Sequence, residues 1–164
     1  MREVAREIRD VVDAAGPALL GLAAEAVGQK RGPDEWSKKE ILGHLIDSCA
    51  NNHQRVVRGA QNAAQEFPPY DRTWWVAMQH YQEASWPDLV ELFVQVNRHL
   101  SRAIDYLPAE ALGNACNIGK DASVTLEFVI TDYLRHLKMH LGDILEPAEP
   151  ESTAESMISE GGPA

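Results

Sequence analysis

Two histidines near the carboxyl end of the chain have the spacing of helical metal ligands. His136 and His140 lie four residues apart in the segment 125–145, where apolar residues recur every three or four positions as in an amphipathic helix. Residues four apart share one helix face, with Cβ atoms roughly 5–6 Å apart, so two such imidazoles can bind one metal ion. Two ligands do not complete a site, and His44, in the segment 36–47, is our candidate for the third.

The histidine pair also has a purely structural interpretation. Both residues fall on or beside the apolar stripe of their helix, where a buried imidazole needs partners for its two ring nitrogens. A metal ion would serve both residues at once, but a pair of core or rim histidines with ordinary partners produces the same pattern. His53, His80 and His99 are weaker candidates. The Glu-x-x-His motif of di-iron bundles is absent before His136 and His140, which argues against a carboxylate-bridged site.

Four long amphipathic segments must position these residues. Helices are expected over 2–27, 37–64, 85–107 and 125–145, with a short helix over 71–81. Gly16-Pro17 should kink the first helix or split it in two. We see no strand pattern and expect 109–123 to be a connecting loop. The pattern therefore predicts an all-α four-helix bundle over residues 1–146, with a short extra helix between the second and third long helices.

Several helix starts carry clear capping signals. Ser37 with Glu40 three residues later is a capping box, and Asp71, Ser85 and Thr125 are expected to cap the later helices. Glu146-Pro147 should end the last helix. From residue 147 to 164 Pro, Glu, Ser and Gly dominate, so this tail is expected to be disordered.

Composition narrows the classes of function. The chain has 164 residues, 45% of them hydrophobic, and a formal net charge of -10. A basic footprint for nucleic acid or for an anionic membrane surface is missing, so neither is an expected partner. We find no apolar run long enough for a bilayer and no signal-peptide pattern at the start, and therefore expect a cytoplasmic location. Cys49 and Cys116 are expected to be reduced, structural thiols.

The motifs around the histidines resemble the two signatures of the DinB-like (DinB/YfiT) superfamily. The first is similar to Trp36-Ser37, Glu40 and Gly43-His44-Leu45-Ile46-Asp47, and the second to Thr125-Leu126-Glu127-Phe128, Asp132-Tyr133, His136 and His140-Leu141. Between them, Tyr70-Asp71, Trp74-Trp75, Tyr81 and the segment 97–100 also look like the family. The resemblance spans about residues 36–145.

This resemblance implies a fold, a metal and a range of reactions. It implies a bundle of up-down-down-up connectivity and a divalent metal, such as Zn, Ni, Fe or Mn, held by His44, His136 and His140. Members of the family include S-transferases that use a low-molecular-weight thiol of the bacillithiol or mycothiol type. Family members are often dimers, so a homodimer is a further expectation.

A thiol S-transferase acting on a small electrophile is accordingly the predicted activity. Three histidines leave a position open on the metal, where a thiol or water would have its pKa lowered. We expect Trp74, Trp75 or Tyr133 to form an apolar wall of the substrate pocket, and Asp47 and Asp132 to orient imidazoles. Asp143, three residues after His140, is an equal candidate for orienting that imidazole. The alternatives are a metal-dependent hydrolase and a non-catalytic bundle that binds metal or dimerises.

Overall fold

Four long helices build the molecule, which is described here from a computed structural model. They are α1 (Arg2–Leu20), α3 (Lys38–Gln61), α5 (Trp86–Asp105) and α6 (Leu126–Leu145). The structure describes residues 1–119 and 123–146, so the predicted disordered tail at 147–164 lies outside the described residues. Helix α1 packs on α5 and α6, and α3 packs on the same two helices from the other side. The predicted four-helix bundle is therefore confirmed.

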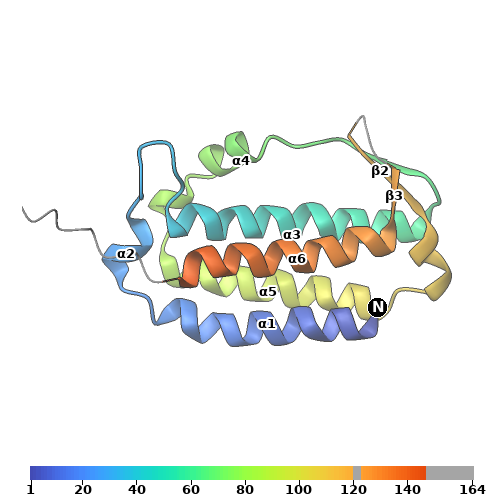
Figure 1. Cartoon of the computed structure of the whole chain (residues 1–164), viewed down its shortest axis with the longest axis horizontal. Coiled ribbons are helices and arrows are strands. Elements are labelled where there is room, and N and C mark those ends of the chain that lie inside the picture. The colour runs from blue at the N-terminus through green and yellow to red at the C-terminus, as the bar shows by residue number, and fades with distance from the viewer. Residues whose placement is uncertain (120–122, 147–164) are drawn as a thin grey trace, which may run out of the picture.

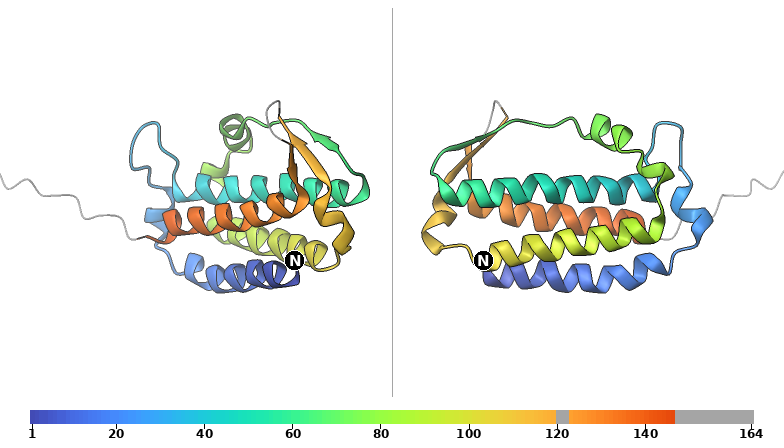
Figure 2. Two further views of the ribbon diagram at one scale, coloured as in Figure 1. Left: turned by 45° about the vertical axis from the view of Figure 1, so that its right-hand side comes forward. Right: turned by 180° about the vertical axis from the view of Figure 1, so that it is seen from behind.

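The connectivity of the bundle is up-down-down-up (Figure 1). Helices α3 and α5 run in the same direction, so the chain must return along the whole bundle between them. This return, residues 62–85, runs along the length of α3 on the side away from α1, as the views in Figure 2 also show. It contains strand β1 (Gln65–Phe67), helix α4 (Arg72–Met78) and the 3₁₀ turn η1 (Tyr81–Glu83). Helix α6 then runs antiparallel to α3, so the end of α6 meets the start of α3.

The helix starts follow the predicted capping chemistry closely. Ser37 caps α3 with both arms of a capping box: its Oγ accepts from the backbone of Glu40, and its own N–H donates to the Glu40 carboxylate at 2.8 Å. Asp71 and Thr125 also accept backbone N–H groups of α4 and α6. Ser85 occupies the N-cap position of α5, although its side chain makes no capping bond. The helix predicted over 71–81 ends at Met78.

The first helix breaks later than predicted. Helix α1 runs through Gly16 and Pro17 and ends at Leu20, and a short helix α2 (Ala24–Gly28) follows. Pro17 is tolerated because it lies on the exposed face near the end of the helix, while Gly16 is buried against α5. A Cβ at Gly16 would lie 3.3 Å from Val94, so this glycine permits close helix packing instead of a kink.

The expectation of a structure without strands is wrong. Strand β2 (Ala115–Ile118) pairs in parallel with β1 and antiparallel with β3 (Ser123–Thr125), and the 3₁₀ turn η2 (Ala109–Gly113) precedes them. The segment predicted as a loop therefore holds a small sheet at the end of the bundle where α3 ends and α6 begins (Figure 1). These strands are only three or four residues long, too short to show an alternating pattern, and β2 pairs with β1 from a distant part of the chain.

The core between the four helices is apolar, but α3 brings a stripe of polar side chains into it. His44, Asp47, Ser48 and Asn52 are all at most 8% exposed. On α5, Asn97 is fully buried and accepts a hydrogen bond from the hydroxyl of Tyr133 on α6. Since burying polar groups costs free energy unless they are paired, the polar stripe on α3 identifies the part of the bundle where function is to be sought. Among the described residues no helix is long and apolar enough to cross a membrane.

Candidate metal centre

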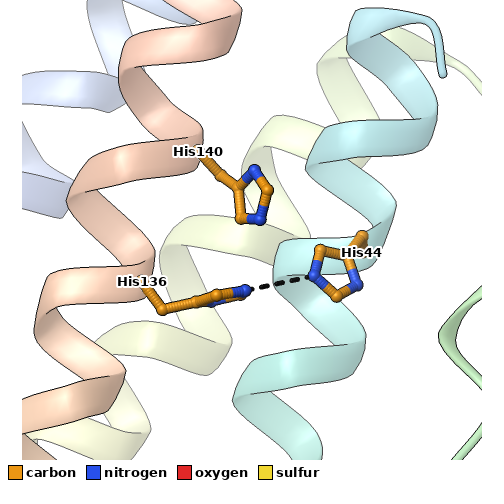
Figure 3. Close-up of side chains that lie close together, drawn as sticks. All are labelled: His44, His136 and His140. Atoms are coloured by element: carbon orange, nitrogen blue, oxygen red, sulfur yellow. Dashed lines mark hydrogen bonds between the residues drawn. The ribbon is translucent and has the colours of Figure 1, made fainter. Parts of the chain in front are cut away.

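The antiparallel packing of α3 and α6 brings the three predicted histidines together. His44 lies near the start of α3, and His136 and His140 lie in the last turns of α6 (Figure 3). One ring nitrogen from each histidine falls within 4.8 Å of the others. The Nε2 atoms of His44 and His136 are 3.2 Å apart. His44 and His136 are 92 positions apart in the chain, yet they lie in one cluster with His140, which shares a face of α6 with His136.

The donor set fits a small divalent cation. A tetrahedral ion with metal–nitrogen distances of about 2.0–2.1 Å separates its ligand nitrogens by roughly 3.3–3.4 Å. The observed 3.2 Å between the two Nε2 atoms is close to that separation. Without a cation, one of these nitrogens must carry a proton and donate to the other, so only a cation lets both offer a lone pair.

Burial keeps two histidines of the cluster neutral. His44 is 3% exposed, and desolvation, followed by the charges of His136, His140 and Arg72, lowers its pKa to about 4. Desolvation and then His140 lower the pKa of His136 to about 4 as well. Both imidazoles are therefore unprotonated at neutral pH, which is the state that a metal ligand requires.

Two residues outside the cluster orient its imidazoles. The Nδ1 of His140 is 2.9 Å from the carboxylate of Asp143, which leaves Nε2 as the nitrogen available to a metal. The Nδ1 of His136 is 3.5 Å from the hydroxyl of Ser48. The Nδ1 of His44 is buried and has no partner among the described residues. The ring of Trp36 lies against His44, with centroids 5.2 Å apart.

The two carboxylates predicted to orient imidazoles have other partners. Asp47 accepts hydrogen bonds from the Tyr81 hydroxyl at 2.7 Å and from Gln79 at 2.6 Å, and its second oxygen is buried and unpaired. Asp132 forms an exposed ion pair with Arg135 at 2.8 Å, although its charge still acts to raise the pKa of His136. Asp143, which was only an equal alternative in the sequence, makes the contact with a ligand imidazole.

A pocket of about 230 Å³ opens beside His44 and His136. It lies between the α3–α6 pair and the return connection, and most of its lining is polar. The residues around it are His44, Ser48, Asn52, Arg55, Tyr70, Arg72, Asp132, Tyr133 and His136. Of the three aromatic residues predicted to form a wall, only Tyr133 lines this pocket. Trp74 is 60% exposed, and the ring of Trp75 lies against that of Tyr70 with centroids 5.0 Å apart and planes tilted by 58°.

Two arginines of this pocket were missed in the sequence. Arg55 lies on α3, and Arg72 is the first residue of α4. A signal existed for Arg55. His44, Ser48, Asn52 and Arg55 follow one another at spacings of four, four and three residues, which place all four on one helix face. The sequence contained no such signal for Arg72, because the return connection that carries it is positioned only by tertiary packing.

The remaining histidines lie away from the cluster. His53 on α3 stacks near His99 on α5, with ring centroids 4.8 Å apart, and His80 is exposed. Among the described residues, the only group of three or more side chains placed to hold a metal is the three-histidine cluster.

Comparison with known proteins agrees with this architecture. The family model of the DinB superfamily matches residues 6–144. Among solved structures, the fold matches that of YfiT from Bacillus subtilis, described as a probable metal-dependent hydrolase with an unusual four-helix bundle topology. The TM-score is 0.78 at 17% sequence identity, over 87% of this chain and 82% of YfiT. A search of curated proteins gave no significant match.

Proposed function

Because this chain belongs to the DinB superfamily, we propose that it is a metal-dependent enzyme whose divalent cation is held by His44, His136 and His140. The observation that carries the proposal is the convergence of three histidine side chains, two of which, His44 and His136, line a polar pocket. The ion is Zn, Ni, Fe or Mn, since imidazole suits several of these metals. The substrate is a small molecule, because the adjoining pocket has a volume of only about 230 Å³.

Three protein ligands leave a position open, and a cation held in this way supplies a Lewis acid that lowers the pKa of a water or thiol. The chain's own residues would do the rest. Asp143 holds His140 in the tautomer that offers Nε2, and Ser48 contacts the outer nitrogen of His136. Hydroxyl and amide groups of Ser48, Asn52 and Tyr70 line the pocket, where they can orient polar substrate atoms.

Hydrolysis is the reaction that we favour. The polar lining of the pocket suits water as a reactant, and the assignment of YfiT as a probable metal-dependent hydrolase points the same way. Thiol transfer, predicted from the family resemblance, stays a prediction: it relied on an apolar wall for the electrophile, and the two tryptophans expected there do not line the pocket. A bundle that only binds metal is the non-enzymatic alternative.

The metal site is tested by elemental analysis of protein purified without chelator. The parent is expected to carry close to one equivalent of a divalent metal, and His136→Ala should lose it. His99→Ala is the matched control, because this histidine is exposed on another helix and should keep the parent's metal content. Equal metal content in the parent and His136→Ala would remove the basis of the proposal.

The reaction is tested on the metal-loaded protein with panels of small esters, amides and electrophiles, each with and without added thiol. Product formation without thiol, lost in His136→Ala, is the expected result. Turnover only with thiol would instead support the S-transferase. A fully loaded protein that turns over no substrate in either panel would favour the metal-binding bundle.

A further inference from the structure

The pocket beside the histidines is lined by more basic than acidic side chains. The chain carries a net charge of -10, yet two arginines, Arg55 and Arg72, line the pocket with a single carboxylate, Asp132. That carboxylate is already paired with Arg135, at 2.8 Å. The two guanidinium groups therefore dominate the charge of the pocket.

Arg55 is placed in a way that structural arginines seldom are. It is half-buried, and desolvation lowers its pKa. Among the described residues it forms no salt bridge, and its one hydrogen bond is a long one, 3.4 Å from Nη1 to the amide oxygen of Asn52. A partly buried guanidinium that lacks a carboxylate partner costs folding free energy. Such a cost is expected where the charge serves a ligand.

Arg72 approaches the same pocket from the return connection. It is exposed and has no ion pair among the described residues. It lines the pocket together with His44 and His136. Tyr70 lies near both arginines, and the charges of both act on its hydroxyl. The pocket thus has one arginine on each side, from α3 and from the start of α4.

Two other arginines of the chain have carboxylate partners and serve as a comparison. Arg98 is bound to Asp13 at 2.7 Å, joining α5 to α1, and Arg135 is bound to Asp132 within α6. Both are on the exposed surface. Arg55 and Arg72 differ from them because each points its charge at a pocket and neither has a carboxylate partner in the described part of the chain.

We propose that the substrate of this site is a small organic anion, whose carboxylate or phosphate group is bound by Arg55 and Arg72 while its reacting part faces His44 and His136. Guanidinium groups bind both kinds of oxyanion through paired, charge-assisted hydrogen bonds. A pocket of about 230 Å³ holds only a small molecule, with the anionic group at one end. This inference rests on the proposed function for the role of the histidines, but the anion site itself needs no metal.

The test is a binding titration of metal-free, ¹⁵N-labelled protein followed by NMR at constant ionic strength. Metal-free protein is used because an anion could otherwise bind the cation. Succinate and methyl phosphate are the anionic probes, and succinamide is the uncharged match of succinate. We expect saturable shifts of the Arg55 side-chain N–H signal and of amides near Ser48 and Tyr70 with an anion, and none with succinamide. The stronger of the two anions identifies carboxylate or phosphate as the recognised group.

Variants then locate the site. Arg55→Gln and Arg72→Gln are each expected to weaken binding of the preferred anion by about tenfold or more, because each removes a charged donor. Arg98→Gln removes the same charge on another face and should bind like the parent. Arg72 is exposed, so its variant keeps the test valid even if Arg55→Gln fails to fold.

Two results would overturn the inference: no saturable binding of either anion to the parent, or equal binding by the parent and both pocket variants. Neither result touches the metal site, which is measured by elemental analysis. Conversely, absence of metal would overturn the proposed enzyme and leave the anion site standing. The two ideas therefore fail separately.

Discussion

The imidazoles of His44 and His136 are neutral at neutral pH because the fold buries them. Each has its pKa lowered to about 4, first by desolvation and then by the neighbouring histidines. In the unfolded chain a histidine has a pKa of about 6.5. Below that pH the histidines bind protons in the unfolded chain but not in the native cluster. The burial that keeps the ligands neutral therefore also lowers the stability of the metal-free protein in acid.

Metal-free protein should therefore lose stability as the pH falls from about 6.5 towards 4. The contribution of His44 is fully present above pH 6.5 and declines by up to about 1.4 kcal/mol for each pH unit below it. Urea unfolding at a series of pH values measures this loss. His44→Gln should flatten the dependence, whereas His80→Gln, at an exposed position, should leave it unchanged. Parallel curves for the parent and His44→Gln would contradict this account.

The carboxylates differ in what they touch, which leads to a second prediction. Asp143→Asn removes the acceptor that holds His140 in place and is expected to weaken metal binding by about 10- to 100-fold. Asp132→Asn should have a smaller effect, because that carboxylate contacts Arg135 and not a ligand imidazole. Competition with a chromogenic chelator measures both affinities. A larger loss in Asp132→Asn would restore the assignment first expected from the sequence.

At the scale of the elements, the return connection is fastened to α3 beside the cluster. The Tyr81 ring of η1 packs directly on Gly43, and its hydroxyl donates to the buried carboxylate of Asp47. Lys38 contacts the carbonyls of Ile144 and Glu146, where the start of α3 meets the end of α6. These contacts fix the relative positions of the elements that carry the histidines and the pocket.

Gly43→Ala tests the packing of Tyr81 on α3. The added Cβ would lie 2.1 Å from the Tyr81 ring, so the turn must move, and we expect a loss of about 1–3 kcal/mol in unfolding free energy. Gly142→Ala is the matched control in α6, where a Cβ would meet nothing within 4 Å. It should gain about 0.5–1 kcal/mol from higher helix propensity. Urea unfolding of both variants gives the comparison, and a Gly43→Ala protein as stable as the parent would refute the close packing.

For the molecule as a whole, the core and the metal site are separable. Large apolar side chains such as Phe93, Leu100 and Leu137 are fully buried in a hydrophobic core to which all four helices contribute. The bundle should therefore fold without a metal, unlike small domains in which a metal replaces the core.

Chelation is accordingly expected to leave the helical circular dichroism unchanged and to lower the Tm. A ligand present at about 100 times its Kd stabilises the native state by about 2.7 kcal/mol, and chelation removes that amount. His136→Ala should have the lower Tm from the start and should not respond to added metal. Loss of helical signal on chelation would show that the metal has a structural role instead.

The sequence by itself determined the four helices, most of their caps and the three histidines, because each of these depends on local periodicity or on a motif read within a few turns. The spacing of His44, Ser48, Asn52 and Arg55 is also a local signal for one helix face, although Arg55 was missed as a pocket residue. Capping of α3 by Ser37 and Glu40 is the clearest case, since both hydrogen bonds form between residues three apart.

Only the tertiary structure decided which carboxylate orients a ligand, where the first helix ends, that a small sheet forms, and that Arg72 joins Arg55 at the pocket. Asp47 and Asp143 are both three residues from a histidine, so spacing cannot separate them. In the structure Asp47 accepts a hydrogen bond from Tyr81, whereas Asp143 contacts the imidazole of His140. The pairing of β1 with β2 and the position of Arg72 depend on contacts between distant segments, which form only once the helices have packed.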